Sequence, residues 1–575
     1  MYRRVMAFDF DGTTAVNDAV PQELEQALEQ CRATGHALFL VTGRRFESIP
    51  LGRVGELVTG VVWENGAVLA HTATGEVYLP FGQLNARLLK ALEETGIPLK
   101  RGLAIAATVM PHDQAVWQII SGLGGGASVE YNKGNVMVLP PGAAKGAGLE
   151  RLLTICGFSA HNLAAFGDAE NDLSMLTLAE VAVAVGDAVL AVREIADLVA
   201  EKAGPAGVLE ILERYPLGGR YFDLPLRRDR MIPIGQDEAG GQVSLPASRL
   251  VGRNLGVFGD SGTGKSWVVG LLAEGLHHEE YQVLLVDPEG DFRGLRALPR
   301  FVALGGDQSS LPQPSAVVAL LDAGGVSVVL DLSRYPVTLR DRYLVELMRA
   351  LRPLRERKYR PHWIVLDEAQ QHLPPSGSEV ANALIPQLEG DGWAFVSYRP
   401  DRLDPVVLQS VHHCLLTRLT EPEAIKAVRE HCGECGLVET NLAAMPVGGV
   451  LLGDRIVRLR PALRRVPHIR HLYKYVDVPL PPGKRFWFRD AQAGMGMEAA
   501  SLYEFLHLIP AVPLASLEYH DGREDFSEWA ETALGDVDLA ARLRKLSHRQ
   551  LRGEPLREAL LQTVVTRYDE LNALC

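Results

Sequence analysis

Two long stretches of the chain alternate short apolar runs with amphipathic segments. In residues 1–214, RVMAFDF and HALFLVTG have the length and composition of buried strands, and VPQELEQALEQCRATG between them has the apolar spacing of a helix. The alternation resumes in residues 249–465, with runs such as HWIVLDEA. Because strands that alternate with helices form mostly parallel sheets, the pattern predicts an α/β fold with two doubly wound parallel-sheet domains.

Three segments depart from this alternation. Residues 81–139 carry a helical pattern followed by short strands and the hairpin-like SVEYNKGNVMVL, which predicts a small α+β module inserted into the first domain. Residues 215–248 contain proline, glycine and many charges, and we expect a linker there. The linker-like PLPPGKRFWFRD begins near residue 480, and residues 480–575 are expected to form an α-helical C-terminal domain.

Length and composition limit the classes of protein to consider. The chain has 575 residues, of which 47% are hydrophobic and 22% charged, as in ordinary globular domains. No run of about 18 apolar residues is present and the first ten residues lack an apolar stretch, so we expect no membrane segment or secretory signal. The six scattered cysteines fit a reducing, cytoplasmic environment. The net charge of −13 gives no support to DNA as a partner, although a local basic patch could still bind it.

Two aspartates end the first apolar run, at Asp9 and Asp11. Alternate residues of a strand point to the same side, so the two carboxylates would repel each other unless a positive group offset their charge. A divalent cation is the expected group. The alternative is an ordinary Asp-Gly turn at the end of an edge strand.

Four polar motifs of the first domain are expected at the ends of strands in one sheet. They are Asp9–Thr13, Thr42–Arg44, Lys145 and Gly167–Asp172. In open α/β sheets, ligands bind at the carboxyl ends of the strands. The motifs would supply a nucleophilic carboxylate, a second carboxylate for proton transfer, a hydroxyl, an ammonium group and oxygen ligands for a metal, which together favour phosphoryl transfer.

Residues 1–214 resemble the haloacid dehalogenase superfamily of phosphatases. The resemblance rests on DFDGT, TGR, Lys145 and GDAENDLSML, in this order. ENGA at Glu64–Ala67 is typical of the sugar-phosphatase-like, Cof-type branch, in which a cap is inserted where residues 81–139 lie. The short cap is similar to that of the compact phosphoglycolate-phosphatase-like members. The resemblance implies a Rossmann-like phosphatase core and activity on a small phosphorylated metabolite. A catalytically dead regulatory copy is the alternative.

The resemblance also implies a role for each polar residue. Asp9 would be the nucleophile that forms an aspartyl-phosphate, and Asp11 would protonate the leaving oxygen and then activate water. Thr42 and Lys145 would hold the phosphoryl group. The implied ligands of Mg²⁺ are Asp9, Asp11 through its backbone carbonyl, Asp168 and Asp172, with Asn171 as an alternative to Asp172.

The second domain contains a phosphate-binding loop in GVFGDSGTGKSWVV, between a predicted strand and a predicted helix. Backbone N–H groups at such a helix start bind phosphates, the lysine neutralises the β- and γ-phosphates, and the serine binds Mg²⁺. In HWIVLDEAQ, Asp367 would join the metal shell and Glu368 would polarise water. The residues expected to bind ATP are Gly259, Asp260, Ser261, Gly262, Thr263, Gly264, Lys265, Ser266 and Asp367.

Residues 230–460 resemble the HerA-like class of P-loop ATPases. The resemblance rests on VDPEGDF, on the loop and DE motifs, and on FVSYRPDRLDPVVLQS. The class usually has glutamine where this chain has Tyr398, and that glutamine senses the γ-phosphate or the attacking water, so we expect slow hydrolysis. Members commonly form hexameric DNA motors, which implies a possible homo-oligomer through this domain.

Three functions remain open from the sequence. The first is a Mg²⁺-dependent phosphohydrolase fused to an ATP-binding and hydrolysing domain. The second is an ATP-driven DNA translocase or remodelling motor with an accessory phosphatase. The third is a signalling protein in which the ATP site gates the phosphatase.

The C-terminal region resembles a small helical domain family of unknown function, most clearly in EYHDGREDFSEW. His520, Arg523 and Asp525 within it would form either a site or a network of caps and ion pairs that holds helices together.

Overall fold

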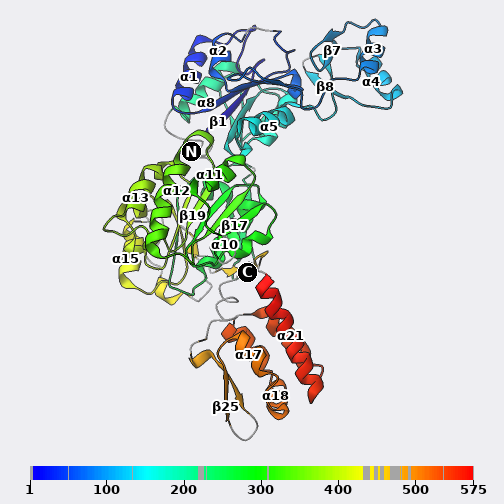
Figure 1. Cartoon of the computed structure of the whole chain (residues 1–575). Helices are drawn as coiled ribbons and strands as arrows, with labels where there is room; N and C mark the ends of the chain where they lie inside the picture. The colour runs from blue at the N-terminus through cyan, green and yellow to red at the C-terminus, as the bar shows by residue number, and fades with distance from the viewer. Residues whose placement is uncertain are drawn as a thin grey trace.

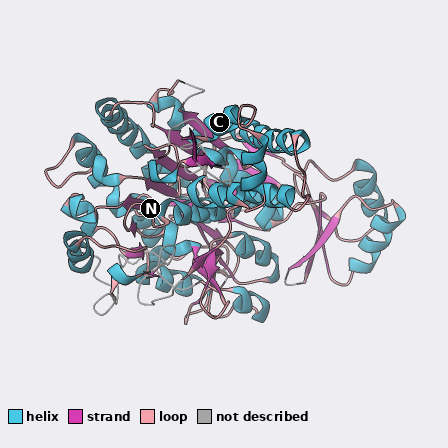
Figure 2. Ribbon diagram, turned by 90° about the horizontal axis from the view of Figure 1, so that it is seen from below, coloured by secondary structure: helices cyan, strands magenta, loops and turns pink. Residues whose placement is uncertain are grey.

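The computed structural model shows three large regions in succession along the chain, with a small cap inserted into the first (Figure 1). It describes residues 4–48, 51–132, 134–217, 226–227, 229–306, 310–431, 441–445, 451–452, 459–466, 480, 482–489, 494–534 and 536–573. Strands lie inside and helices outside in the first two large regions (Figure 2), which confirms the predicted fold class of two doubly wound sheets followed by helices.

The first sheet has eight strands in the order β12-β11-β10-β1-β2-β3-β4-β5. Pairing is parallel from β12 to β3 and antiparallel for β4 and β5. The strands are β1 (Val5–Asp9), β2 (Ala37–Val41), β3 (Gly60–Trp63), β4 (Val68–His71), β5 (Val77–Tyr78), β10 (Leu163–Gly167), β11 (Val181–Ala184) and β12 (Leu198–Val199). Every residue of β1 is buried, as expected for a strand covered on both faces.

Helices cover both faces of this sheet because each presents an apolar stripe. In α1 (Gln22–Ala33), Leu24, Ala27, Leu28 and Cys31 recur at helical spacing and are buried. The other helices of the region are α2 (Gly52–Leu57), α5 (Lys145–Cys156), α6 (Leu173–Leu178), α7 (Leu190–Ile195) and α8 (Gly204–Arg214).

The inserted module is a separate α+β cap with its own core. Its antiparallel sheet has the order β6-β7-β9-β8, with strands β6 (Lys100–Arg101), β7 (Ala106–Val109), β8 (Ser128–Asn132) and β9 (Asn135–Leu139). The helices α3 (Ala86–Glu94) and α4 (Asp113–Gly122) pack against one face through Leu88, Leu92, Val116 and Ile120. Figure 1 shows the cap at the carboxyl side of the first sheet.

The second large sheet has the order β17-β18-β16-β19-β20-β15-β21-β22, with only β22 antiparallel. The strands are β15 (Leu255–Phe258), β16 (Val283–Asp287), β17 (Phe301–Gly305), β18 (Ser327–Asp331), β19 (Trp363–Leu366), β20 (Trp393–Ser397), β21 (His413–Leu416) and β22 (Leu451–Leu452). The helices are α9 (Ala247–Val251), α10 (Lys265–His278), α11 (Pro314–Ala323), α12 (Val337–Lys358), α13 (Glu379–Leu384), α14 (Pro405–Gln409) and α15 (Pro422–His431).

Part of the segment predicted as a linker forms a sheet instead. β13 (Met231–Gln236) and β14 (Gln242–Pro246) pair with β23 (Arg460–Pro461) in a three-stranded sheet. Ile232 and Ile234 are buried against the second domain, and Ile232 lies close to Gly275 of α10. The alternation of apolar and polar residues in β13 is short and lies among charged residues, so the sequence analysis did not predict a strand there.

The C-terminal region begins with a hairpin that the sequence did not predict. β24 (Phe486–Arg489) pairs with β25 (Gly494–Ala499), and Phe486 and Phe488 are buried while the residues between and after them are exposed. The predicted helices follow as α17 (Leu502–Leu508), α18 (Leu514–Asp521), α19 (Asp525–Trp529), α20 (Val537–Ser547) and α21 (Glu554–Ala573). The resemblance to a family of unknown function stays a prediction.

The polar residues singled out in this region bind one another. His520 accepts a hydrogen bond at Nε2 from the Arg489 backbone N–H over 3.0 Å, and its Nδ1 lies 2.8 Å from the Asp525 carboxylate. Arg523 lies 3.5 Å from the same carboxylate. Because His520 is buried and both of its nitrogens have partners, the arrangement favours the structural alternative.

The first two domains meet at the amino-terminal edges of their sheets. Glu180, just before β11, accepts a hydrogen bond from the hydroxyl of Tyr281, just before β16, over 2.7 Å. His161, just before β10, stacks on Tyr281 with ring centroids 3.9 Å apart. The Tyr359 hydroxyl, just before β19, donates to the backbone carbonyl of Gly35, just before β2. The carboxyl edges of both sheets therefore point away from the junction.

Among the described residues, no helix is both long and apolar enough to span a membrane.

Candidate active sites

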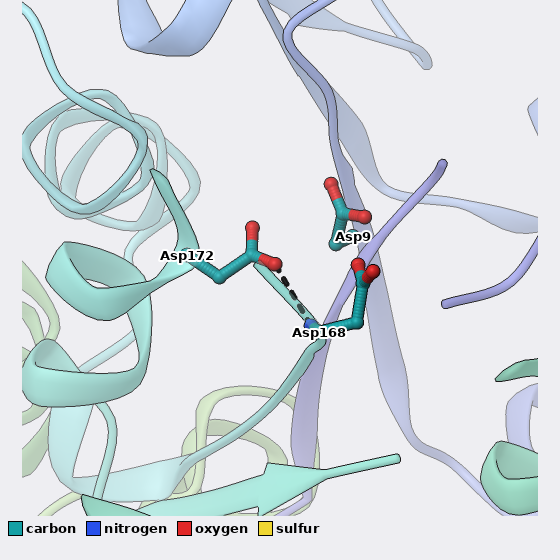
Figure 3. A group of neighbouring side chains, drawn as sticks. All are labelled: Asp9, Asp168 and Asp172. Atoms are coloured by element: carbon teal, nitrogen blue, oxygen red, sulfur yellow. Dashed lines mark hydrogen bonds between the residues drawn. The ribbon is translucent and has the colours of Figure 1, made fainter. Parts of the chain in front are cut away.

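Three buried carboxylates meet at the carboxyl edge of the first sheet. Asp9 ends β1, Asp168 follows β10, and Asp172 ends the short helix η3 (Glu170–Asp172). One oxygen of each lies within 4.8 Å of the others (Figure 3). The Asp168 backbone N–H donates to Asp172 Oδ2 over 2.9 Å, so the loop after β10 holds one carboxylate with its own backbone.

Lys145 is the positive group inside this cluster. It is buried, and its Nζ lies 2.5 Å from Asp9 Oδ1 and 2.6 Å from Asp172 Oδ1. Burial and repulsion from Asp172 nevertheless raise the pKa of Asp9 well above its ordinary value, because the pull of Lys145 only partly offsets them. The carboxylate oxygens of Asp9, Asp168 and Asp172 lie close together, and hard oxygen donors in this arrangement fit a divalent cation.

Close helix packing sets the position of Lys145. The lysine begins α5, and that helix lies directly against the short helix η1 (Glu64–Gly66). A Cβ on Gly148 of α5 would stand 2.4 Å from the Gly66 Cα, so only glycine permits this approach. The helix start, and with it Lys145, is thereby held against the carboxylates.

The prediction that Asp9 and Asp11 lie on the same side of a strand is wrong, because β1 ends at Asp9 and the Asp11 side chain is not part of the group of three carboxylates. The Asp11 oxygens accept hydrogen bonds from Arg44 Nε and Nη2 at distances of 2.7 to 3.2 Å, and the side chain is 35% exposed. Thr13, two residues later, donates to Asp168 Oδ1 over 3.1 Å. The Asp11 carboxylate is thus a separate group beside the cluster. This placement leaves only its backbone carbonyl for the metal role predicted from the sequence.

Thr42 lies at the end of the neighbouring strand. It is buried, and its Oγ1 accepts the Arg44 backbone N–H over 3.1 Å. The structure therefore brings Asp9, Asp11, Thr42 and Lys145 to one edge, but Lys145 comes from the start of α5 and not from the end of a strand as predicted.

The cap contributes a residue that the sequence analysis missed. Glu130 of β8 accepts a hydrogen bond at Oε2 from Asn65 Nδ2 over 2.8 Å. Asn65 in turn accepts one from Asn171 Nδ2 over 3.2 Å. Burial raises the pKa of Glu130 to about 7. In the sequence, the only indication of this role was an acidic residue between apolar and aromatic neighbours in SVEYNKGNVMVL.

The phosphate-binding loop joins β15 to α10. Gly264 has φ +105°, a conformation that favours glycine, and Lys265 starts the helix. Lys265 Nζ donates to the Asp260 carbonyl over 2.9 Å, and Thr263 Oγ1 donates to the same carbonyl over 2.7 Å. The loop is therefore closed on itself, with the lysine at its centre.

Asp367 and Glu368 follow β19, two strands away from β15 in the sheet. Burial, followed by the charges of Asp291 and Asp287, raises the pKa of Asp367 well above its ordinary value. No described residue makes a hydrogen bond with its buried Oδ2. A carboxylate in this state fits a cation. Glu368 is also buried, with its Oε2 bound by Gln370 Nε2 over 2.5 Å.

The strand β20 lies between β15 and β19 and brings Ser397 and Tyr398 to the same edge. Ser397 Oγ donates to Gln370 Oε1 over 2.6 Å, so one amide bridges Glu368 and β20. Tyr398 is 39% exposed. Arg399 makes a bidentate ion pair with Asp401, as a surface arginine commonly does.

Comparisons with known proteins assign both regions. Residues 6–94 and 114–212 match the family of haloacid dehalogenase-like hydrolases, and residues 232–374 match the helicase HerA central domain. The phosphoglycolate phosphatase of Methanothermobacter thermautotrophicus is 30% identical over 224 residues, which cover 37% of this chain and 98% of the relative. That of Sulfurisphaera tokodaii is 27% identical over 223 residues, which cover 37% of this chain and 95% of the relative.

Solved structures similar to this chain include a haloacid dehalogenase-like hydrolase from Bacteroides thetaiotaomicron, at 21% identity and a TM-score of 0.34. It covers 37% of this chain, and 99% of its own length is matched. From the family match and the 30% identity to the Methanothermobacter relative, the chain belongs to the haloacid dehalogenase superfamily of phosphatases, and it carries in addition a P-loop ATPase domain of the HerA type.

Proposed function

We propose that this protein is a Mg²⁺-dependent phosphohydrolase that acts on a small phosphorylated metabolite through an aspartyl-phosphate intermediate. The observation that carries the proposal is the buried group of Asp9, Asp168 and Asp172 around Lys145, with the Asp11 carboxylate beside it. The named relatives are phosphoglycolate phosphatases, which makes small phosphoesters the first class to test.

In the proposed reaction Asp9 attacks phosphorus, and Asp11 gives a proton to the oxygen that leaves. Asp11 then takes a proton from the water that attacks the aspartyl-phosphate, which releases phosphate and restores Asp9. Lys145 and Thr42 hold the phosphoryl oxygens, and Arg44 orients Asp11. When bound by Asp9, Asp168, Asp172 and the Asp11 carbonyl, Mg²⁺ neutralises the negative charge that gathers there.

Phosphate release from a panel of small phosphoesters tests this proposal. We expect turnover with Mg²⁺ and its loss after chelation, with recovery when Mg²⁺ is added back, because three buried carboxylates then regain their counter-charge. Turnover that survives complete chelation would contradict the metal assignment. No phosphate release from any member of the panel would contradict the proposed activity.

For the second domain we propose that the loop from Gly259 to Ser266 binds ATP, with Ser266 and Asp367 holding Mg²⁺ and Glu368 polarising water. The orphaned, buried oxygen of Asp367 supports a cation at this place. The alternative proposal for this domain is a DNA motor, which salt-dependent DNA binding would favour. An oligomer through this domain is a further proposal.

Replacing Lys265 with alanine is expected to weaken ATP binding by about tenfold or more, because the γ-phosphate loses its neutralising ammonium group. Phosphatase kcat and KM should stay unchanged, because the two candidate sites lie on edges that point away from the junction. Calorimetry with ATP and phosphate-release kinetics measure the two effects. A phosphatase that fails in the Lys265 variant would instead favour the gating alternative.

A further inference from the structure

One face of the cap sheet is directed at the phosphatase core. Cross-strand pairing aligns Lys100, Ala107, Met137 and Glu130 in one row across β6, β7, β9 and β8, and directly paired residues share a face. Met137 and Ala107 pack against the phosphatase core, whereas their neighbours Val138 and Ala106 pack in the cap core. Glu130 therefore shares the face that covers the catalytic edge.

The surroundings of Glu130 connect it to the catalytic carboxylates. Its Oε2 is bound by Asn65, and Asn65 is bound by Asn171, which lies between Asp168 and Asp172. Glu130 is attracted by Lys145 and repelled by Asp172. Within the described chain, no residue makes a hydrogen bond with its second oxygen, Oε1, and the residue as a whole is only half-buried. One acceptor of the carboxylate thus remains available to a ligand.

A substrate would extend from the catalytic edge toward this face. Its phosphoryl group is expected beside Asp9 and Lys145, so the rest of the molecule must lie in the direction of the cap. Glu130 is the acidic residue in the row that faces it, while the basic residue, Lys100, stands on the far edge strand. A partly buried carboxylate repels an anionic group nearby and accepts hydrogen bonds from hydroxyl or ammonium groups.

We infer that Glu130 is a specificity-determining residue that selects phosphoesters whose leaving group carries hydroxyl or ammonium groups and disfavours those that carry a carboxylate. The inference rests on the proposed phosphatase activity and names the substrate class of that site. The inference predicts that this chain disfavours 2-phosphoglycolate, the ester for which the relatives described above are named and whose leaving group carries a carboxylate. Such a site disfavours a substrate that leaves its polar groups unpaired or that brings a like charge close to it, and the size of the substrate matters less.

The test compares kcat/KM for three phosphoesters in Mg²⁺ at a pH of about 8.5, where Glu130, whose pKa burial raises to about 7, is mostly ionised. Glycerol 3-phosphate carries hydroxyl groups, 2-phosphoglycolate carries a carboxylate, and p-nitrophenyl phosphate reports the basal chemistry. We expect the wild type to prefer glycerol 3-phosphate to 2-phosphoglycolate. Glu130→Gln should lower that preference by about tenfold or more, because it removes the charge and keeps the shape. The kcat/KM for p-nitrophenyl phosphate of the same variant is the reference for each ester, so that a change in the basal chemistry is separated from a change in the selection of the leaving group.

Two further variants separate specificity from structure. Glu130→Asp retains the charge and should retain the preference for glycerol 3-phosphate. Glu94→Gln makes the same chemical change at an exposed position of α3 and should change nothing. An unchanged substrate ratio in Glu130→Gln, or a wild type that prefers 2-phosphoglycolate, would overturn the inference while leaving the phosphatase standing. Absence of activity on all three esters would overturn both.

Discussion

Asp9→Asn is expected to abolish phosphate release, with a loss of at least about 10³-fold in kcat, because an amide of the same shape cannot attack phosphorus. The variant should fold. Burial, followed by repulsion from Asp172, raises the pKa of Asp9, so replacing its carboxylate with an amide relieves both the burial of a charge and part of the repulsion. We expect the metal-free variant to unfold at a temperature no lower than that of the metal-free wild type.

The matched control is Glu29→Gln, which neutralises an exposed carboxylate of α1 paired only at the surface with Arg53. It should leave both kcat and the unfolding temperature unchanged. Folded Asp9→Asn protein that kept near-wild-type phosphate release would remove Asp9 from the role of nucleophile. A large loss of stability without metal would show that the carboxylates do not repel as the geometry indicates.

The local motifs were sufficient to predict the two sheets and the convergence of Asp9, Asp168 and Asp172. Each motif directly follows an apolar strand or begins a helix, and parallel strands bring their carboxyl ends to one edge. The sequence also predicted a positive group beside Asp9, and the structure places Lys145 there. What the sequence could not give was the direction of Asp11, which depends on Arg44 from the next strand.

Other features depend on contacts between distant segments, which no local pattern records. Glu130 reaches the catalytic edge only because β8 pairs with β9 in one register, and a shift of one residue would turn it toward the cap helices. The strand that contains Ile232 was hidden among charged residues, and it is stabilised by packing on α10. The amide bridge of Gln370 likewise joins residues from two strands.

For the ATPase domain, Glu368→Gln is expected to lower ADP release by about 10²-fold or more while ATP binding persists. Glu368 is buried and already aligned by the Gln370 amide at the edge where the phosphate-binding loop lies. A glutamine there keeps the shape but cannot accept the proton of the attacking water. If calorimetry showed that this variant no longer binds ATP, Glu368 would instead be a residue needed for nucleotide binding or for folding.

Tyr398→Gln is expected to raise the basal rate of ADP release by about tenfold or more, because the wild type lacks a planar amide at the end of β20. A tyrosine hydroxyl offers one donor, and this side chain is 39% exposed, so it orients water poorly. Tyr398→Phe is the matched control, and it should leave the slow wild-type rate almost unchanged if the hydroxyl does little. The measurement is steady-state ADP release from the wild type, Tyr398→Gln and Tyr398→Phe. Fast turnover by the wild type, equal in Tyr398→Gln, would contradict the prediction and point to Gln370 as the amide already in use.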